Sequence, residues 1–67
     1  MPLVTIQITD EGVTPTQKAA LIQGATELLQ RVLDKNPATT MVLIDELPLA
    51  NWGIGGLPVE IYRQQHR

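Results

Sequence analysis

The stretch over residues 39–47 reads as a β-strand whose central residues, 41–44, are all apolar. Successive side chains of a strand point to opposite faces of a sheet, so both faces of this strand need a cover. A continuous apolar run of this kind is typical of strands in parallel sheets. The chain is therefore limited to folds in which another layer lies on each side of residues 39–47.

A second strand and a long helix precede this segment. Residues 3–9 alternate between apolar and polar positions, which is typical of a half-buried strand. A capping signal over residues 14–17 starts a helix at Pro15, and apolar residues recur at spacings of three and four as far as Asp34. Pro37 then stops the helix. The order predicts an α/β chain: a single βαβ unit with two parallel strands and a right-handed crossover.

The segment after residue 47 predicts irregular structure. Residues 48–56 hold three of the five glycines and the only Trp, which predicts a turn or a short hairpin. Residues 57–62 fit a last short strand, and residues 63–67 a frayed end. Gly24, inside the predicted helix, is either tolerated or marks a close approach of the helix to the sheet. We expect one domain over residues 1–67.

A chain of 67 residues is marginal as an isolated fold. It has no Cys and a single His, His66, so disulfides and a structural metal are excluded as supplements to the core. Hydrophobic residues make up 43% of the chain and charged residues only 18%, and one helix covers only one face of a two-stranded sheet. We therefore expect a homo-oligomer that buries the second face.

Charge and composition also exclude several classes of function. The net charge is −2 and no basic run is present, which argues against a nucleic-acid partner. The longest apolar runs are far shorter than the roughly 20 residues that span a bilayer, and no leader opens the chain, so we expect a soluble, cytoplasmic protein without a membrane partner. Without Ser or Cys, and with no metal-ligand spacing, we expect neither those nucleophiles, nor a metal, nor a cofactor.

Pro2 is the residue with the clearest chemical potential. Met before a small residue is normally excised, and removal of Met1 leaves a prolyl secondary amine at the start of an apolar strand. Desolvation disfavours the charged form of an amine and lowers its pKa, so that it can act as a general base near pH 7. With Met1 attached, the Pro2 nitrogen is an amide and cannot do so. Pro at position two is also common in proteins without any catalytic role.

Four features together resemble the 4-oxalocrotonate tautomerase family over residues 2–56. They are Pro2 opening a strand, the cap over residues 14–17 followed by Lys18 and the long helix, the strand 40–46, and the segment 52–56. The resemblance implies a tautomerase fold assembled as a homohexamer, a trimer of dimers, in which the proline moves a proton between oxygen and carbon of a small-molecule substrate. It also places Trp52 at the aromatic wall of the active site, where the alternative is an interface or core aromatic.

The sequence departs from that family at its two substrate-binding arginines. The corresponding places hold Gly12–Val13 and Met41, so the charged hydrogen bonds to a dicarboxylate are lost. We therefore expect a small, apolar substrate with at most one carboxylate, such as an arylpyruvate enol, rather than 2-hydroxymuconate. Arg63 is the candidate replacement cation, and Asn51, otherwise a turn residue, is a candidate hydrogen-bond donor.

Two alternatives stay open beside the tautomerase. One is a haloacrylate dehalogenase-type hydrolase, in which Asp45 or Glu46 would activate water. The other is a non-catalytic member of the family that binds a ligand or only assembles, having lost its activity with the two arginines.

Overall fold

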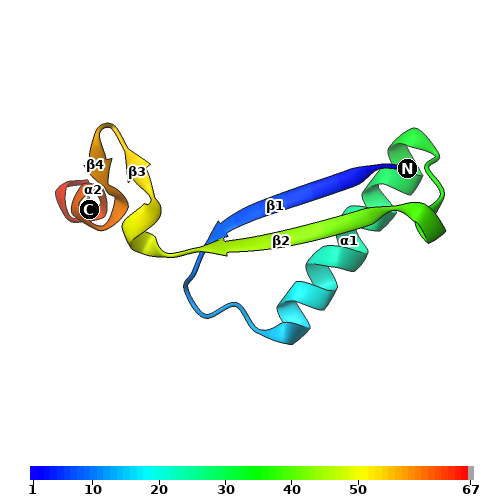
Figure 1. The fold of residues 1–67 in the computed structure, drawn as a ribbon, viewed down its shortest axis with the longest axis horizontal. Coiled ribbons are helices and arrows are strands. Elements are labelled where there is room, and N and C mark those ends of the chain that lie inside the picture. The colour runs from blue at the N-terminus through cyan, green and yellow to red at the C-terminus, as the bar shows by residue number, and fades with distance from the viewer. Residues whose placement is uncertain (67) are drawn as a thin grey trace.

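The computed structural model describes residues 1–66 and confirms the predicted βαβ unit (Figure 1). Strand β1 (Leu3–Thr9) leads through a loop into helix α1 (Pro15–Leu33), and β2 (Met41–Leu47) returns parallel to β1. Leu3 lies opposite Met41 and Thr9 opposite Leu47. Two short 3₁₀ turns, η1 and η2, flank β2, and a C-terminal arm follows. Their bounds are Pro37–Thr39 for η1 and Leu49–Asn51 for η2, and the arm consists of β3 (Gly53–Ile54), β4 (Leu57–Pro58) and α2 (Val59–Gln65).

The start of β2 differs slightly from the prediction. The strand begins at Met41 rather than at residue 39, because Asn36 caps a turn there. Its side-chain oxygen accepts a hydrogen bond from the Ala38 backbone N–H (3.0 Å), and Pro37 occupies the first helical position. The helix start agrees with its capping signal, since the Thr14 side chain and Gln17 hydrogen-bond each other's backbone reciprocally.

The arm contains the predicted hairpin, but the predicted last strand over residues 57–62 is wrong. Only Leu57 and Pro58 pair with β3, which offers just two residues to pair with. Beyond Pro58 no further strand edge is available, and the backbone closes into α2 with Glu60 in its first turn, where a negative charge is favoured. The predicted frayed end is also wrong as far as Gln65, and Arg67 lies outside the described residues.

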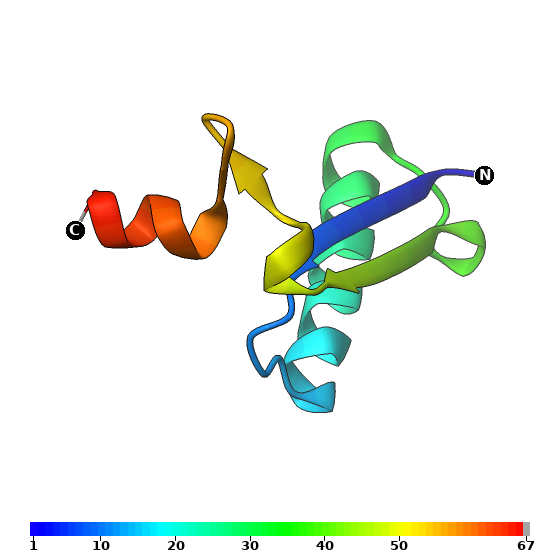
Figure 2. The ribbon, with the colours of Figure 1, turned by 60° about the vertical axis from the view of Figure 1, so that its left-hand side comes forward.

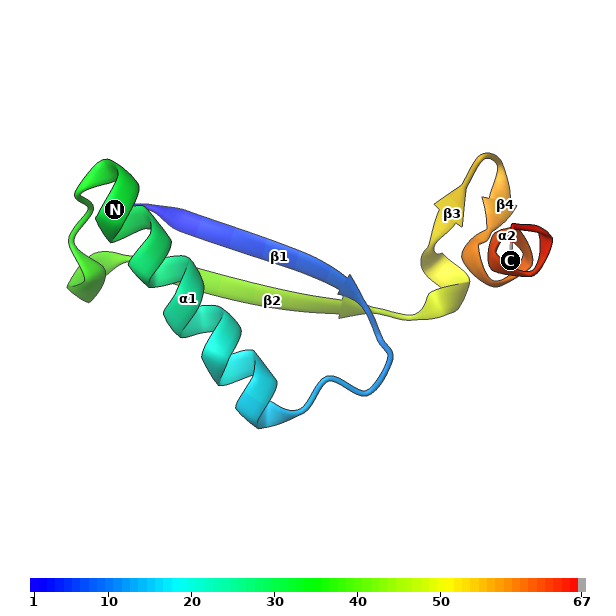
Figure 3. The same cartoon turned by 180° about the vertical axis from the view of Figure 1, so that it is seen from behind.

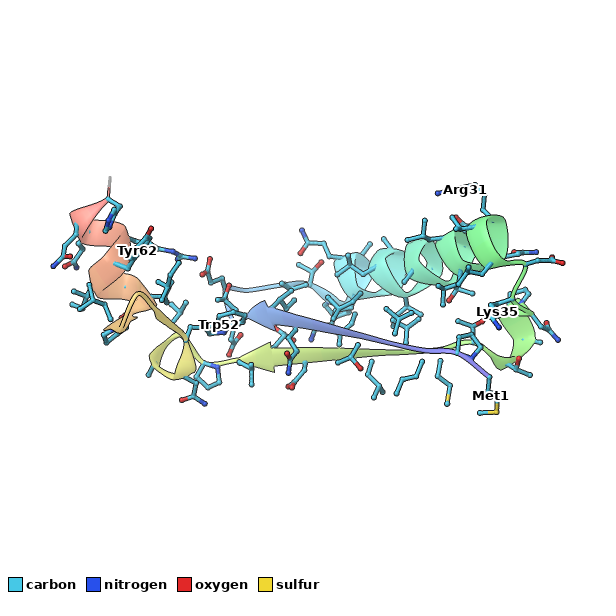
Figure 4. The ribbon with its side chains drawn as sticks, turned by 90° about the horizontal axis from the view of Figure 1, so that it is seen from above. Met1, Arg31, Lys35, Trp52 and Tyr62 are labelled. Atoms are coloured by element: carbon cyan, nitrogen blue, oxygen red, sulfur yellow. The ribbon has the colours of Figure 1, made fainter. Side chains whose placement is uncertain are left out.

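Helix α1 covers one face of the β1–β2 pair and leaves the other open (Figures 3 and 4). Along both strands the even-numbered residues, from Val4 to Ile8 and from Val42 to Glu46, are half-buried beneath the helix. The odd-numbered residues Leu3, Met41 and Leu43 lie on the opposite face and are 54%, 44% and 55% exposed. We call this second surface the open face.

The described part of the chain, residues 1–66, forms no hydrophobic core of its own. Within residues 1–66, no hydrophobic side chain is fully buried. The radius of gyration is 15.3 Å, whereas a compact domain of this length has about 11 Å. Figure 2 shows why: the arm projects away from the βαβ unit instead of packing under it. The large apolar side chains left exposed are Met1, Leu3, Leu21, Ile22, Leu28, Val32, Leu33, Met41, Leu43, Ile54 and Ile61.

Two further features bear on the sequence-based expectations. Gly24 is exposed, and no atom lies within 4 Å of the place where a Cβ would stand, so no close approach to the sheet requires glycine there. Of the helices in residues 1–66, none combines the length and the apolar character needed to cross a bilayer.

Candidate active site

Pro2 lies at the entrance of β1, immediately beside the start of β2. It is half-buried, and its carbonyl oxygen accepts a 3.0 Å hydrogen bond from the backbone N–H of Met41. Leu3, the next residue along β1, lies opposite Met41 of β2, and both apolar side chains are exposed on the open face. Met1 is 85% exposed, so the peptide bond that joins it to Pro2 stands at the surface. The fold therefore anchors Pro2 by its carbonyl while leaving its nitrogen side accessible.

Asn51 and Trp52 are consecutive residues just after β2, at the end of the strand pair opposite Pro2. Asn51 ends η2 and is exposed. The backbone N–H of Trp52 donates to the Leu49 carbonyl (3.1 Å), and the Trp52 carbonyl accepts from the backbone N–H of Val59 (2.9 Å). The backbone of Trp52 is therefore hydrogen-bonded to both η2 and the start of α2. The indole is half-buried, and its Nε1–H is shielded without a hydrogen-bond partner within residues 1–66. A shielded donor of this kind normally has a hydrogen-bond partner, and residues 1–66 supply none.

Arg63 joins the arm to the loop between β1 and α1. One guanidinium nitrogen lies 2.9 Å from Oε1 of Glu11, with the two side chains 52% and 41% exposed. The hydrogen bond from Arg63, with a second from the Thr9 side chain, lowers the pKa of Glu11 below its ordinary value of 4.5. No pattern in the sequence predicts this pair, because its members are separated by most of the chain and belong to elements without a shared periodicity.

A groove lies between the end of β1 and the first turns of α1. Its volume is about 570 Å³, within the range of small-molecule sites. Val13, one of the residues that stand where the family arginines were expected, forms part of its wall. The lining residues are Ile8, Thr9, Glu11, Val13, Gln17, Ala20 and Leu21.

The predicted site residues fall into two groups that one chain does not bring together (Figure 4). Pro2 and Met41 lie at the start of the strand pair, whereas Asn51, Trp52 and Arg63 lie beyond its end. A strand of seven residues that rises about 3.3 Å per residue places roughly 20 Å between the two ends. Within a single chain, therefore, neither the aromatic ring nor the arginine reaches the proline.

The two carboxylates considered for a hydrolase are placed apart from both groups. Glu46 points under α1 and forms an ion pair with Lys18, while Asp45 lies on the open face. A carboxylate engaged by Lys18 is a poor base for water, and Asp45 has no cationic pair beside it in the described chain. Residues 1–66 also contain no cluster of three or more His, Cys, Asp or Glu side chains that would hold a metal ion.

Known proteins resemble this chain along nearly its whole length. A family model described as "Tautomerase enzyme" matches residues 2–62. A probable tautomerase of Dickeya dadantii is 58% identical over 65 residues, which is 97% of each chain. The crystal structure of DmpI from Helicobacter pylori superposes with a TM-score of 0.87 at 42% identity, covering 94% of this chain and 97% of that one. A heterohexamer 4-oxalocrotonate tautomerase from Chloroflexus aurantiacus gives a TM-score of 0.81 at 27% identity, over 90% and 95% of the two chains.

Proposed function

This chain belongs to the tautomerase family as a homologue of 4-oxalocrotonate tautomerase, and on that premise we propose that it isomerises a small enol or 2-keto acid with Pro2 as general acid and base. The placement of Pro2 is the observation that carries the proposal. The residue is held at the mouth of β1 by its carbonyl, next to Leu3 and Met41, while Met1 extends into solvent where it is open to excision.

The proposed reaction transfers one proton and needs no cofactor. After loss of Met1 the Pro2 amine removes the hydroxyl proton of an enol, and the electrons of the O–H bond form the carbonyl. The π electrons of the enol C=C bond then take that proton back from the ammonium, at the alkene carbon that does not bear the oxygen, so the product is an isomer of the substrate and the amine is regenerated. Apolar neighbours favour this exchange because they disfavour the charged ammonium, which lowers the pKa of the amine and keeps it unprotonated near pH 7.

The substrate class follows from the charges that surround these residues. Met41 beside Pro2 and Val13 in the groove are both uncharged, so neither place supplies a cation for a carboxylate. Trp52 offers an aromatic face and Arg63 one positive charge. We propose an aromatic substrate with a single carboxylate, of which the enol of phenylpyruvate is the model compound, in preference to the dicarboxylate 2-hydroxymuconate.

The proposed active site is complete only in an assembly. Pro2 and Trp52 lie at opposite ends of the strand pair, so an indole that walls the proline has to come from another copy. The exposed apolar residues of the open face form a surface that such a neighbour would cover. The 4-oxalocrotonate tautomerase from Chloroflexus aurantiacus is a heterohexamer. We propose a homohexamer, with Asn51 and Arg63 reaching the substrate across a subunit boundary.

The test combines an intact mass with an activity assay on untagged protein. Loss of one Met from the mass, together with ketonisation of phenylpyruvate enol, is the expected result. A mass that retains Met1 and no activity would instead favour the non-catalytic reading, since the Pro2 nitrogen would be an amide. The hydrolase has less support, because Glu46 is already paired with Lys18.

A further inference from the structure

We propose that Glu11 is a resident carboxylate that holds Arg63 at the mouth of the groove and is displaced when the carboxylate of a ligand takes its place. The groove then recognises small apolar monocarboxylates through Arg63, with Glu11 as an internal competitor. That the ligand is also the substrate rests on the proposed function. The binding itself does not, and it is measured separately.

The guanidinium of Arg63 does not itself line the groove but contacts Glu11, which does. Glu11 lines the groove, and its Oε1 atom lies 2.9 Å from a guanidinium nitrogen of Arg63. A carboxylate that enters from solvent can reach the same guanidinium, because both side chains are about half exposed. Thr9 lines the groove beside Glu11, so the ion pair lies at the rim of the groove.

Arg63 is the cation that is positioned for this role among residues 1–66. Lys18 is engaged by Glu46 beneath α1. Arg31 and Lys35 lie at the far end of α1, away from the arm (Figure 4). The walls on which the rest of a ligand would lie are mainly apolar, with Ile8, Val13 and Leu21 among them. One cation at the rim and apolar walls together fit a ligand with one carboxylate and an apolar body.

The strength of the pair suits displacement. Exposed ion pairs are weak, so Glu11 reduces the affinity of a competing carboxylate by only about two- to five-fold. A ligand that also buries an apolar body recovers more than this from the groove walls. A small hydrophilic anion gains nothing from the apolar walls, so Glu11 competes with it effectively for Arg63. An apolar acid binds in spite of that competition. Glu11 is in this sense a specificity-determining residue.

The test uses cinnamate, an unreactive aromatic monocarboxylate, and its neutral isostere cinnamamide, with binding to the assembled protein measured by calorimetry. Glu11→Gln is expected to tighten cinnamate binding about two- to five-fold. Arg63→Gln is expected to weaken it about ten-fold, as does the Glu11→Gln and Arg63→Gln double variant. Cinnamamide binding changes in none of them. Asp10→Asn is the matched control, since it removes one negative charge from the adjacent position, where no ion pair is formed within residues 1–66.

Three results would overturn the proposal. Weaker cinnamate binding in Glu11→Gln would show that Glu11 only positions Arg63. An equal gain in cinnamate affinity in Asp10→Asn would show that the effect comes from net charge alone. Unchanged cinnamate binding in Arg63→Gln would show that Arg63 does not contact the ligand carboxylate. On the unmodified protein, an NMR titration gives a second check: saturating cinnamate should return the pKa of Glu11 toward its ordinary value. A protein without isomerase activity would sink the proposed function but leave these binding results readable.

Discussion

Leu43 is the residue at which folding and assembly can be tested together. It lies at the centre of the open face and is 55% exposed in the single chain. Complete burial of a leucine stabilises a protein by about 1.5–3 kcal/mol, so covering the exposed half contributes about 1–1.5 kcal/mol per subunit. Leu43→Asp loses that contribution and also buries a carboxylate, at an effective cost of several kcal/mol per charge.

The lost burial of Leu43 and the cost of the buried carboxylate together amount to at least about 4 kcal/mol per subunit. This approaches the stability of a whole small domain. Because residues 1–66 contain no fully buried hydrophobic side chain, a dissociated subunit has no core to keep it folded. We expect Leu43→Asp to lose both the oligomer in light scattering and the folded signal in circular dichroism. In the parent, the unfolding temperature should rise with protein concentration.

The matched control is Thr16→Asp, which adds the same charge in the first turn of α1, where the helix dipole favours it. It should retain the oligomer and its unfolding temperature. A Leu43→Asp variant that matched the parent in size and stability would refute the reasoning, because the open face would then be shown to remain in water. A parent whose unfolding temperature is independent of concentration would refute it as well.

The remaining predictions concern the proline, the substrate, the helix and one carboxylate. Pro2→Ala, with Met1 removed in both proteins, should lower tautomerase activity at least about 100-fold, measured as kcat/KM on phenylpyruvate enol; equal activity would end the role of Pro2. The parent should prefer that enol to 2-hydroxymuconate, since two lost charged hydrogen bonds cost a dicarboxylate about two to four decades, and assays on one preparation decide it. Gly24→Ala should raise the free energy of unfolding by up to about 1 kcal/mol in denaturant titrations, because no atom lies within 4 Å of the added methyl group; destabilisation would reveal a neighbouring subunit there. The pKa of Glu11 is lowered, so its pair with Arg63 is present above the ordinary value of 4.5 and is lost as the pH falls through the lowered one; NMR should show this midpoint moving back up in Arg63→Gln.

The local elements of this fold were predictable because each has a cause within a few residues. The helix begins where the reciprocal cap of Thr14 and Gln17 lies and ends before Pro37, and the alternation in β1 matches its half-buried face. The arm was less predictable. Whether residues 57–62 extend as a strand depends on the length of the partner strand, and β3 offers only two residues. Apolar content alone does not reveal that length.

The candidate site divides along the same line. Pro2 was identified from chemistry that depends on its own position in the chain. Trp52 was identified from an ordered set of motifs, and Arg63 as the candidate replacement for the two missing arginines. The ion pair of Arg63 with Glu11 could not be predicted from the sequence, because it depends on how the arm lies against the loop between β1 and α1. An ion pair between residues so far apart in sequence leaves no periodic signal, and only the fold brings the two charges together.

The shape of the subunit connects these observations. A compact domain of this size would bury its apolar residues and bring its polar groups into one pocket, whereas this chain extends over 44 Å and does neither. The same extension exposes Leu3, Met41 and Leu43 on one face and separates Pro2 from Trp52. If neighbouring copies cover the open face, they are also the source from which the missing wall of the proline site can come. Stability and activity should then fail together when the interface is broken, so that a variant of Leu43 is inactive although it lies outside the proposed substrate contacts.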